Sequence, residues 1–232
     1  MFPRVFALLV FLLGAGPLMA DSTTDGPLQL AQSTSLLDAT GLQVPQAFEI
    51  REQHGKVPTI DLTVAPDDLW ERIRRGFSMP DLNTDLVTDR QIYYINRPGA
   101  LRQIFARSQR YLFYIVEELE RRGMPTELAL LPMVESAFNP MAFSSAQASG
   151  LWQFIPSTGK SYKLEQNWWV DERRDVVAST NAALDYLQTI YEMHGDWQLA
   201  LASYNWGEGA VGRAINKNRA AGLPTEYQYL NM

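Results

Sequence analysis

From Pro98 onward, apolar side chains recur at helical spacing, and glycines and prolines divide the chain into helix-length segments. The first segment opens at Pro98 and Gly99 and carries apolar residues to Leu119, which predicts one long helix. This region does not show the alternation of apolar and polar residues that is typical of strands. The pattern therefore predicts a mainly α-helical chain with an all-α region over residues 98–232.

Breaks in the pattern predict the other helices. A helix is predicted over residues 125–136, and Pro132 should bend it or loosen a turn because proline removes a backbone hydrogen bond. A long amphipathic helix is predicted over residues 175–194, with Gly195 as its stop and Asp196 as the N-cap of the next helix. Shorter helices are predicted over residues 68–77, 197–204 and 210–221.

The N-terminus has the organisation of a signal peptide. Arg4 precedes an unbroken apolar run over residues 5–13, and Ala20 stands before Asp21. The run is short for a transmembrane helix, although an uncleaved anchor remains the alternative. We predict a signal peptide over residues 1–20, export to the periplasm or cell envelope, and an irregular, partly disordered N-terminal extension over residues 21–97.

Composition excludes several classes of function. The net charge is −6, so the chain lacks the basic excess that nucleic-acid binding requires, and no nucleic-acid partner is expected. There is no cysteine, and His54 and His194 are the only histidines. We therefore expect no transition-metal site.

Glu135 is the strongest candidate for chemistry. It closes an apolar helical segment, LALLPMVESAF, where a carboxylate would face the negative end of the helix. Both this position and the apolar neighbours favour the protonated form, which a general acid at neutral pH needs. The alternative is an exposed glutamate at a frayed helix end.

Two further segments carry polar side chains that suit a carbohydrate site. In GLWQF, Gly150 permits a close backbone approach, Trp152 offers an apolar plate and Gln153 offers an amide. In ASYNWGEG, Tyr204 and Asn205 precede a glycine turn and could point into a cleft. Packing in the core, or capping of turns, is the alternative for each of them.

In this order and spacing, these segments resemble the lytic transglycosylases with a soluble-transglycosylase-type domain, which have a goose-lysozyme-like fold. The family pattern is an E-S pair, then G-L-x-Q, then A-x-Y-N-x-G, and all three are present here. The runs LLPMVESAFNP and DERRDVVASTNAAL are especially similar to the D-type enzymes. The resemblance covers roughly residues 98–230 and implies a lysozyme-like catalytic domain over residues 98–232.

The resemblance also implies the site residues, position by position. Glu135 corresponds to the sole catalytic acid/base, and Ser144 to a loop serine that positions the glutamate or the sugar. Gln153, Tyr204 and Asn205 correspond to substrate-binding residues, and the tyrosine in relatives hydrogen-bonds the glutamate. The implied substrate is the glycan strand of peptidoglycan, with no metal and no cofactor.

Two departures from the family pattern stand out. Gln147 precedes Ala148 where relatives often have glycine, which changes the expected geometry of this loop. The sequence ends at Met232, whereas relatives continue with a further helix and many D-type enzymes with LysM repeats. That difference leaves a C-terminal truncation of the catalytic domain open.

Most glycosidases use two carboxylates, whereas this sequence offers one strong candidate. Asp171, Asp175 and Asp185 look structural, as ion-pair or capping residues. A single acid fits a transglycosylase that forms a 1,6-anhydro sugar without consuming water. The alternatives are a goose-type lysozyme-like hydrolase and a non-catalytic peptidoglycan-binding module.

Overall fold

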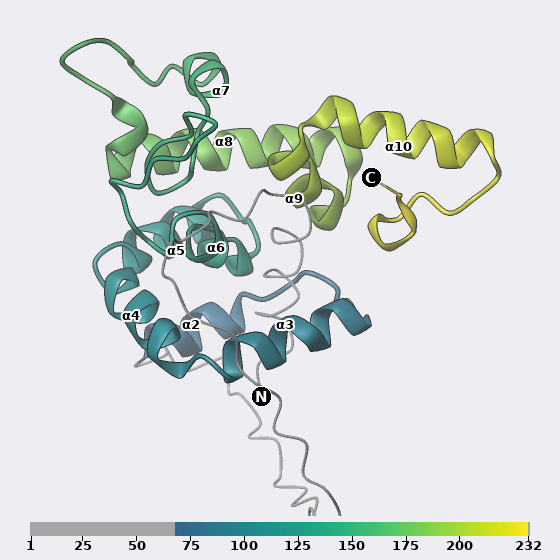
Figure 1. Ribbon diagram of the computed structural model, residues 1–232, viewed down its shortest axis with the longest axis horizontal. Coiled ribbons are helices and arrows are strands. Elements are labelled where there is room, and N and C mark those ends of the chain that lie inside the picture. The colour runs from purple at the N-terminus through teal and green to yellow at the C-terminus, as the bar shows by residue number, and fades with distance from the viewer. Residues whose placement is uncertain (1–67, 232) are drawn as a thin grey trace, which may run out of the picture. The chain divides into compact units, whose positions relative to one another are not determined.

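The computed structural model describes residues 68–231 (Figure 1). The predicted signal peptide, over residues 1–20, and most of the predicted extension, up to residue 67, lie outside the described residues. The described part is mainly helical, as predicted, and contains three isolated β-bridges but no β-strand. None of the helices in this part has both the length and the hydropathy that a membrane span requires.

The described elements are α-helices with short 3-10 helices between some of them and after α10. In chain order they are α2 (Leu69–Arg75), α3 (Asp85–Ile95), α4 (Pro98–Ser108), α5 (Leu112–Arg121), η1 (Thr126–Leu130), α6 (Leu131–Glu135), α7 (Pro156–Ser161), η2 (Glu172–Arg174), α8 (Val176–His194), α9 (Trp197–Trp206), α10 (Glu208–Ala220) and η3 (Tyr227–Tyr229). Helix α9 packs against both α8 and α10, while η1 contacts α2, α5 and α6. The segment between α6 and α8, which includes α7 and η2, joins these two groups of helices (Figure 1).

The single helix predicted from Pro98 to Leu119 is wrong, because the structure divides it into α4 and α5. The break over residues 109–111 contains neither glycine nor proline, so no residue that usually ends a helix marks it in the sequence. At the break, the Ser108 hydroxyl donates to the Phe105 carbonyl at 2.8 Å, and the Tyr111 N–H donates to the Ser108 carbonyl at 2.9 Å. Such local bonds compete with the helical ladder.

Helix α3 was not predicted. Its exposed side chains include Leu86 and Ile95, and Val87 and Tyr94 are its buried residues. Apolar residues on both sides blur the helical periodicity. The predicted domain boundary at residue 98 stays a prediction, although buried side chains of α2 and α3 belong to the same core cluster as the later helices.

The segment predicted as one helix over residues 125–136 consists of η1 followed by α6. Pro132 lies in the first turn of α6, where a missing N–H breaks no helical hydrogen bond. The proline thus marks a change of helix type and not a bend within one helix. The change leaves α6 only five residues long and places Glu135 at its end.

The caps of α8 and α9 agree with their sequence signals. Asp175 accepts a hydrogen bond from the Ala178 N–H at the start of α8, and Gly195 ends α8 with a left-handed φ of 67°. Asp196 then accepts from the Leu199 N–H at the start of α9. These caps fix the α8–α9 corner and thereby the position of the C-terminal end of α9.

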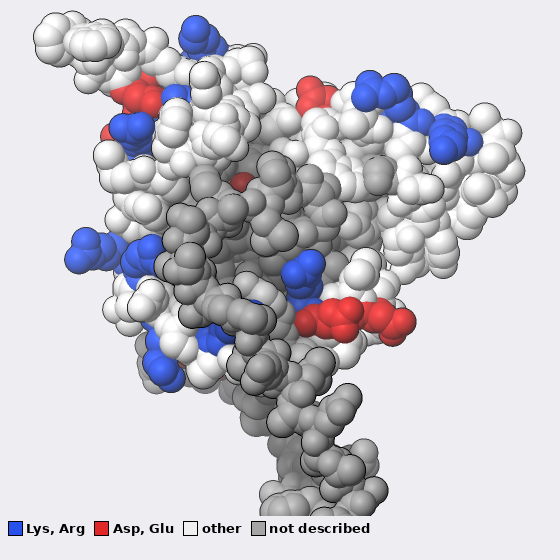
Figure 2. Space-filling model, in the orientation of Figure 1, with Lys and Arg blue, Asp and Glu red and all other residues white. Residues whose placement is uncertain are grey.

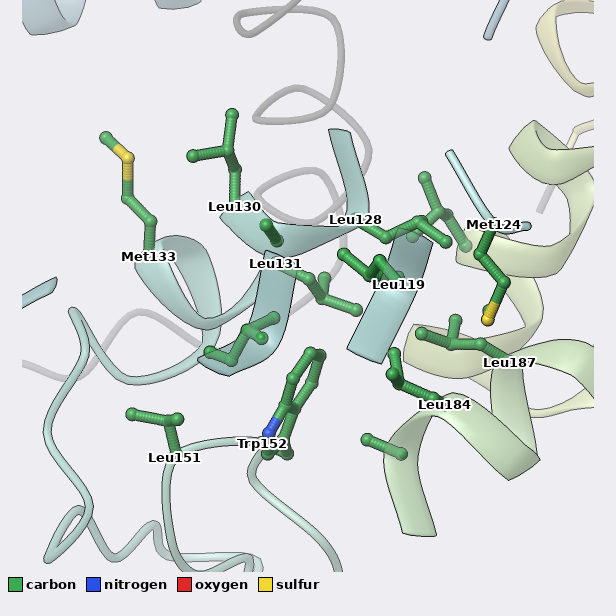
Figure 3. Close-up of a cluster of buried hydrophobic side chains, with 14 of the residues drawn as sticks. Leu119, Met124, Leu128, Leu130, Leu131, Met133, Leu151, Trp152, Leu184 and Leu187 are labelled. Carbon is green, nitrogen blue, oxygen red and sulfur yellow. The ribbon is translucent and has the colours of Figure 1, made fainter. Parts of the chain in front are cut away.

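Trp152 is the largest fully buried side chain of the core. Figure 3 shows it pointing from its loop into a cluster of leucines from α5, η1, α6 and α8. Its indole N–H donates to the Thr180 hydroxyl of α8 at 2.9 Å, so the buried polar atom is satisfied. The packing of Trp152 in the core and its hydrogen bond to Thr180 therefore hold the loop after α6 in place.

We predict that Thr180→Val lowers the free energy of unfolding by about 1–3 kcal/mol, because it leaves the buried Trp152 N–H without its acceptor. Urea denaturation measures this change. Thr88→Val, at an exposed position of α3, is the matched control and should change stability by less than about 0.5 kcal/mol. Equal effects of the two substitutions would contradict the role given to this hydrogen bond.

Candidate active site

Glu135 lies at the C-terminal end of α6 and is partly buried. Burial removes water from around the carboxyl group, and this desolvation raises the pKa of Glu135 from 4.5 to about 8. The carboxyl group is therefore protonated at neutral pH. This agrees in direction with the expectation from the apolar neighbours.

The residue after Glu135 fastens the helix end to the following loop. The Ser136 hydroxyl donates to the Leu151 carbonyl at 2.8 Å. The backbone N–H groups of Ser136 and Phe138 both donate to the Pro132 carbonyl, at 3.1 and 3.0 Å. The E-S pair thus couples an acid at a helix end to the GLWQF segment.

The chain around the site is held in an unusual backbone conformation. Five non-glycine residues in the described part have a positive φ, and four of them lie between α6 and α7: Ala137, Phe138, Gln147 and Gln153. A positive φ is costly for residues with a Cβ, and such residues cluster at functional sites. The loop is therefore held in place by its contacts rather than by its own preferences.

Arg173 provides many of these contacts. Its guanidinium group is buried and donates to the Gln147 carbonyl at 2.7 Å and to the Phe154 carbonyl at 3.0 Å. Two further bonds, both 2.8 Å long, run to the two carboxylate oxygens of Asp171 and balance the charge. As expected from the sequence, Asp171 acts as an ion-pair residue, and Arg173 lowers the pKa of its carboxyl group.

Gly150 lies against the backbone of this arginine. A Cβ at position 150 would come within 1.7 Å of the Arg173 carbonyl oxygen, and the φ of Gly150 is 86°. Only glycine fits both the conformation and the space. This is the close backbone approach that the sequence predicted for Gly150.

Ser144 and Gln153 both take part in the internal bonding of the loop. The Ser144 hydroxyl accepts from the Ala148 N–H at 3.1 Å and closes a tight turn. The Gln153 amide donates to the carbonyls of Gly150, at 2.8 Å, and Ala142, at 3.3 Å. The structure thus shows the turn-capping contacts of Gln153, while its role toward a substrate stays a prediction.

Tyr204 lies near the end of α9, and its hydroxyl donates to the Trp152 carbonyl at 2.7 Å. The resemblance implied a hydrogen bond to the glutamate, and the structure places the phenol proton elsewhere. Burial, followed by the charge of Glu135, raises the pKa of Tyr204, which indicates that the two groups are close. Tyr204 therefore ties the end of α9 to the loop through Trp152.

Sequence reasoning missed a row of aromatic rings that supports Tyr204. Its ring lies 5.3 Å from that of Tyr186, which in turn lies 5.1 Å from that of Tyr162. The Tyr186 hydroxyl donates to the Glu208 carboxylate at 2.9 Å. Tyr186 was hidden because its spacing in α8 is that of an ordinary core residue.

Asn205 follows Tyr204 and is likewise partly buried, one residue before the end of α9. The neighbouring Gly207 has a φ of 86° and starts the turn into α10. The predicted role of Asn205 in binding a substrate stays a prediction.

The other acids considered in the sequence have structural contacts. Asp185 pairs with Arg122 at 2.5 Å, and Asp175 caps α8. No group of histidine, aspartate and glutamate side chains in residues 68–231 is arranged to hold a metal ion. Desolvation raises the pKa of Glu135, whereas arginines lower the pKa of Glu118 and of Asp171.

The helical fold, the acid at a helix end and the loop held beside it agree with the lysozyme-like domain that the sequence predicted. Residues 113–224 match the family model described as the transglycosylase SLT domain, so this chain carries a domain of that family.

Curated relatives agree with this assignment. Membrane-bound lytic murein transglycosylase D of Escherichia coli (strain K12) is 44% identical over 167 residues, which is 71% of this chain and 37% of the relative. A protein of Alteromonas sp. (strain M-1), named for resistance to tributyltin chloride, is 48% identical over 118 residues, or 50% of this chain and 57% of the relative. Membrane-bound lytic murein transglycosylase C of Glaesserella parasuis is 29% identical over 142 residues, which cover 55% of this chain and 39% of the relative. The chain thus spans little more than a third of the D-type relative.

We predict that Gly150→Ala lowers the free energy of unfolding by about 3 kcal/mol or more, through backbone strain and the collision with the Arg173 carbonyl. Gly123→Ala is the matched control, because Gly123 also has a positive φ, of 65°, but has open space around it. It should cost about 1 kcal/mol. Thermal unfolding of both variants tests whether the close approach, beyond the φ angle, fixes this loop.

The raised pKa of Glu135 predicts a dependence of stability on pH. The folded state holds the proton up to about pH 8, whereas the unfolded chain releases it near pH 4.5, so ionisation favours unfolding as the pH rises between these values. Glu135→Gln removes this penalty. The variant should be more stable than wild type at pH 8, by at least about 1 kcal/mol, and the gain should vanish near pH 4.5. A gain that is independent of pH, in denaturant titrations, would contradict the shifted pKa.

Proposed function

We propose that the protein is a peptidoglycan lytic transglycosylase that cleaves the β-1,4 bond between N-acetylmuramic acid and N-acetylglucosamine, with Glu135 as its single acid/base. The raised pKa of Glu135 carries the proposal, because it keeps a proton available at neutral pH. The transglycosylase SLT domain and the relatives named as murein transglycosylases support the choice of substrate.

In the proposed reaction, Glu135 donates its proton to the glycosidic oxygen and the bond to C1 of N-acetylmuramic acid breaks. The acetamido group of the same sugar stabilises the positive charge that develops at C1. The resulting Glu135 carboxylate then accepts the proton of the C6 hydroxyl as its oxygen attacks C1. The product is a 1,6-anhydro sugar, no water is consumed, and Glu135 regains its proton.

Ser144, Gln153, Tyr204 and Asn205 are the proposed substrate-binding residues. Ser144 and Gln153 lie in the loop after α6, and Tyr204 and Asn205 lie near the end of α9. The hydrogen bond from the Tyr204 hydroxyl to the Trp152 carbonyl joins these two segments. Hydroxyl and amide groups in such a setting suit the polar groups of N-acetylated sugars. A rigid loop would hold them in one arrangement before the glycan binds.

We also propose that the protein acts in the periplasm or elsewhere in the cell envelope. The support is the signal-peptide pattern of residues 1–20 and the membrane-bound relatives. Peptidoglycan glycan strands are the proposed partner, and the charge of the chain gives no support to a nucleic-acid partner.

Mass spectrometry of the soluble products released from purified peptidoglycan tests the reaction. We predict 1,6-anhydro muropeptides from the wild type and a loss of at least about 100-fold in their rate of release by Glu135→Gln, since general acid–base catalysis contributes on that order or more. Glu117→Gln, at an exposed position of α5, is the control and should keep full activity.

Products with a reducing end would instead favour a goose-type hydrolase. Absence of any release by a folded wild-type protein would favour a peptidoglycan-binding module without catalytic activity. Full activity of Glu135→Gln would remove Glu135 from the mechanism.

A further inference from the structure

The most exposed large apolar side chains of the described residues lie in one loop. Trp168 and Trp169 expose 89% and 88% of their surface, and the adjacent Val170 exposes 43%. They belong to residues 165–172, a segment that follows α7 and ends at the first residue of η2, and which we call the Trp loop. It projects from the neighbouring helices beside α7 in Figure 1.

The Trp loop is closed by hydrogen bonds at its base. The Glu172 N–H donates to the Glu165 carbonyl at 2.9 Å, and the Glu172 carboxylate accepts from the Glu165 N–H at 2.7 Å. Gln166 and Asp171 form an antiparallel bridge above them. The two ends of the loop therefore hold each other together.

The tip of the Trp loop is shaped by Asn167. The side-chain oxygen of Asn167 accepts from the backbone N–H groups of Trp169, at 2.7 Å, and Val170, at 2.8 Å. The backbone N–H of Asn167 donates to the Val170 carbonyl at 2.8 Å. This is an Asx-type turn, in which a short polar side chain fixes the backbone. The exposure of the two indoles thus results from an ordered turn.

The Trp loop is fastened to the loop that carries the candidate active site. The Gln166 amide donates to the Pro156 carbonyl at 3.0 Å, two residues after Phe154. Asp171 binds the guanidinium of Arg173, which in turn holds the carbonyls of Gln147 and Phe154. A ligand bound on the Trp loop is therefore connected, through Gln166, Asp171 and Arg173, to the loop that contains Gln153.

Two exposed indoles are an unusual surface. Each indole presents roughly 150–250 Å² of mostly apolar area to solvent, and large apolar surface gathered in one exposed loop often marks a binding site. Residues 166–170 carry no charge, and the tip of this loop is white in Figure 2, whereas acidic and basic side chains begin at its base. A partner for this tip is therefore uncharged at the contact.

We propose that the Trp loop is a sugar-binding platform, on which a pyranose ring of the peptidoglycan glycan strand stacks against Trp168 or Trp169. The face of an aromatic ring is electron-rich and attracts the C–H groups that line one face of a pyranose. The proposal rests on the proposed function for its substrate. It adds a contact outside the residues around Glu135, which would hold the polymer while the acid acts.

The charges near the Trp loop favour a glycan over a membrane. Residues 160–174 contain four basic and three acidic side chains, and one of the basic ones, Arg173, is buried against Asp171. Binding to anionic lipid surfaces requires a clear excess of Lys and Arg around the inserted aromatic residues. An uncharged tip with balanced flanks suits a neutral sugar ring.

A binding assay with purified glycan strands, from which the stem peptides have been removed, tests the platform. The full chain carries Glu135→Gln, so that the strands stay intact, and Trp168→Ala/Trp169→Ala is compared with this parent by cosedimentation. We expect about a tenfold loss of affinity, the value of a lost aromatic contact of roughly 1.4 kcal/mol. Trp168→Phe/Trp169→Phe should keep most of the affinity, because phenylalanine preserves the apolar face.

The matched control is Leu86→Ala/Ile95→Ala, which removes two apolar side chains of α3 that are 64% and 65% exposed. It should bind as the parent does. All variants remove exposed side chains, so their thermal unfolding should match that of the parent, which separates lost binding from lost folding.

Unchanged affinity of the double alanine variant would overturn the platform, as would a parent that does not bind glycan strands. The platform would also be overturned if the double alanine variant lost binding to phosphatidylglycerol vesicles but kept its affinity for glycan strands. The same holds if the parent is a dimer and the double alanine variant is a monomer. The proposed function is tested separately by products from the chain with Glu135 intact. If the chain with Glu135 intact releases anhydro products and the double alanine variant binds as the parent does, only the platform is refuted. If the double alanine variant loses affinity but the chain with Glu135 intact releases no products, only the proposed function is refuted.

Discussion

The buried guanidinium of Arg173 is the interaction on which the candidate site depends. It binds the carbonyls of Gln147 and Phe154, on the two sides of Gly150 in the chain, and the backbone carbonyl oxygen of Arg173 occupies the space beside Gly150. Asp171 supplies the balancing charge through a two-point contact. Because an unpaired buried charge is strongly destabilising, this charge can stay in the interior only when the complete arrangement forms. The loop therefore has essentially one folded geometry.

Two further attachments orient that loop toward the acid. Ser136 binds the Leu151 carbonyl from the end of α6, and Tyr204 binds the Trp152 carbonyl from the end of α9. The carbonyls belong to consecutive residues, so the chain at this point is held between the two helices. The core adds a third attachment, because the side chain of Trp152 is buried and bonded to Thr180. A site that is built from two helix ends and one loop thereby gains the rigidity of the core.

Local sequence signals predicted those parts of the fold that local chemistry decides. Asp175, Gly195 and Asp196 mark helix ends correctly because capping depends on a few adjacent residues. The break between α4 and α5 was missed because it is set by the backbone contacts of Ser108, with no glycine or proline to announce it. The raised pKa of Glu135 was predicted in direction from its apolar neighbours. By contrast, the acceptor of the Tyr204 hydroxyl and the aromatic row through Tyr186 depend on contacts between distant segments, which a single sequence does not encode in any local pattern.

The cause of the raised pKa bears on the number of acids in the mechanism. A second carboxylate within a few ångströms would raise the pKa of Glu135 by repulsion, as in sites where two acids share a proton. In the part of the chain that the structure describes, desolvation accounts for the shift. Of the other acids, Asp171 and Asp185 are held by arginines, Asp175 caps a helix start and Glu208 accepts from Tyr186. The buried Glu127 of η1 accepts from the Met79 N–H. An acid that is protonated by its apolar surroundings can give up its proton and take one back without a carboxylate partner, which is the requirement that a single acid/base places on its site.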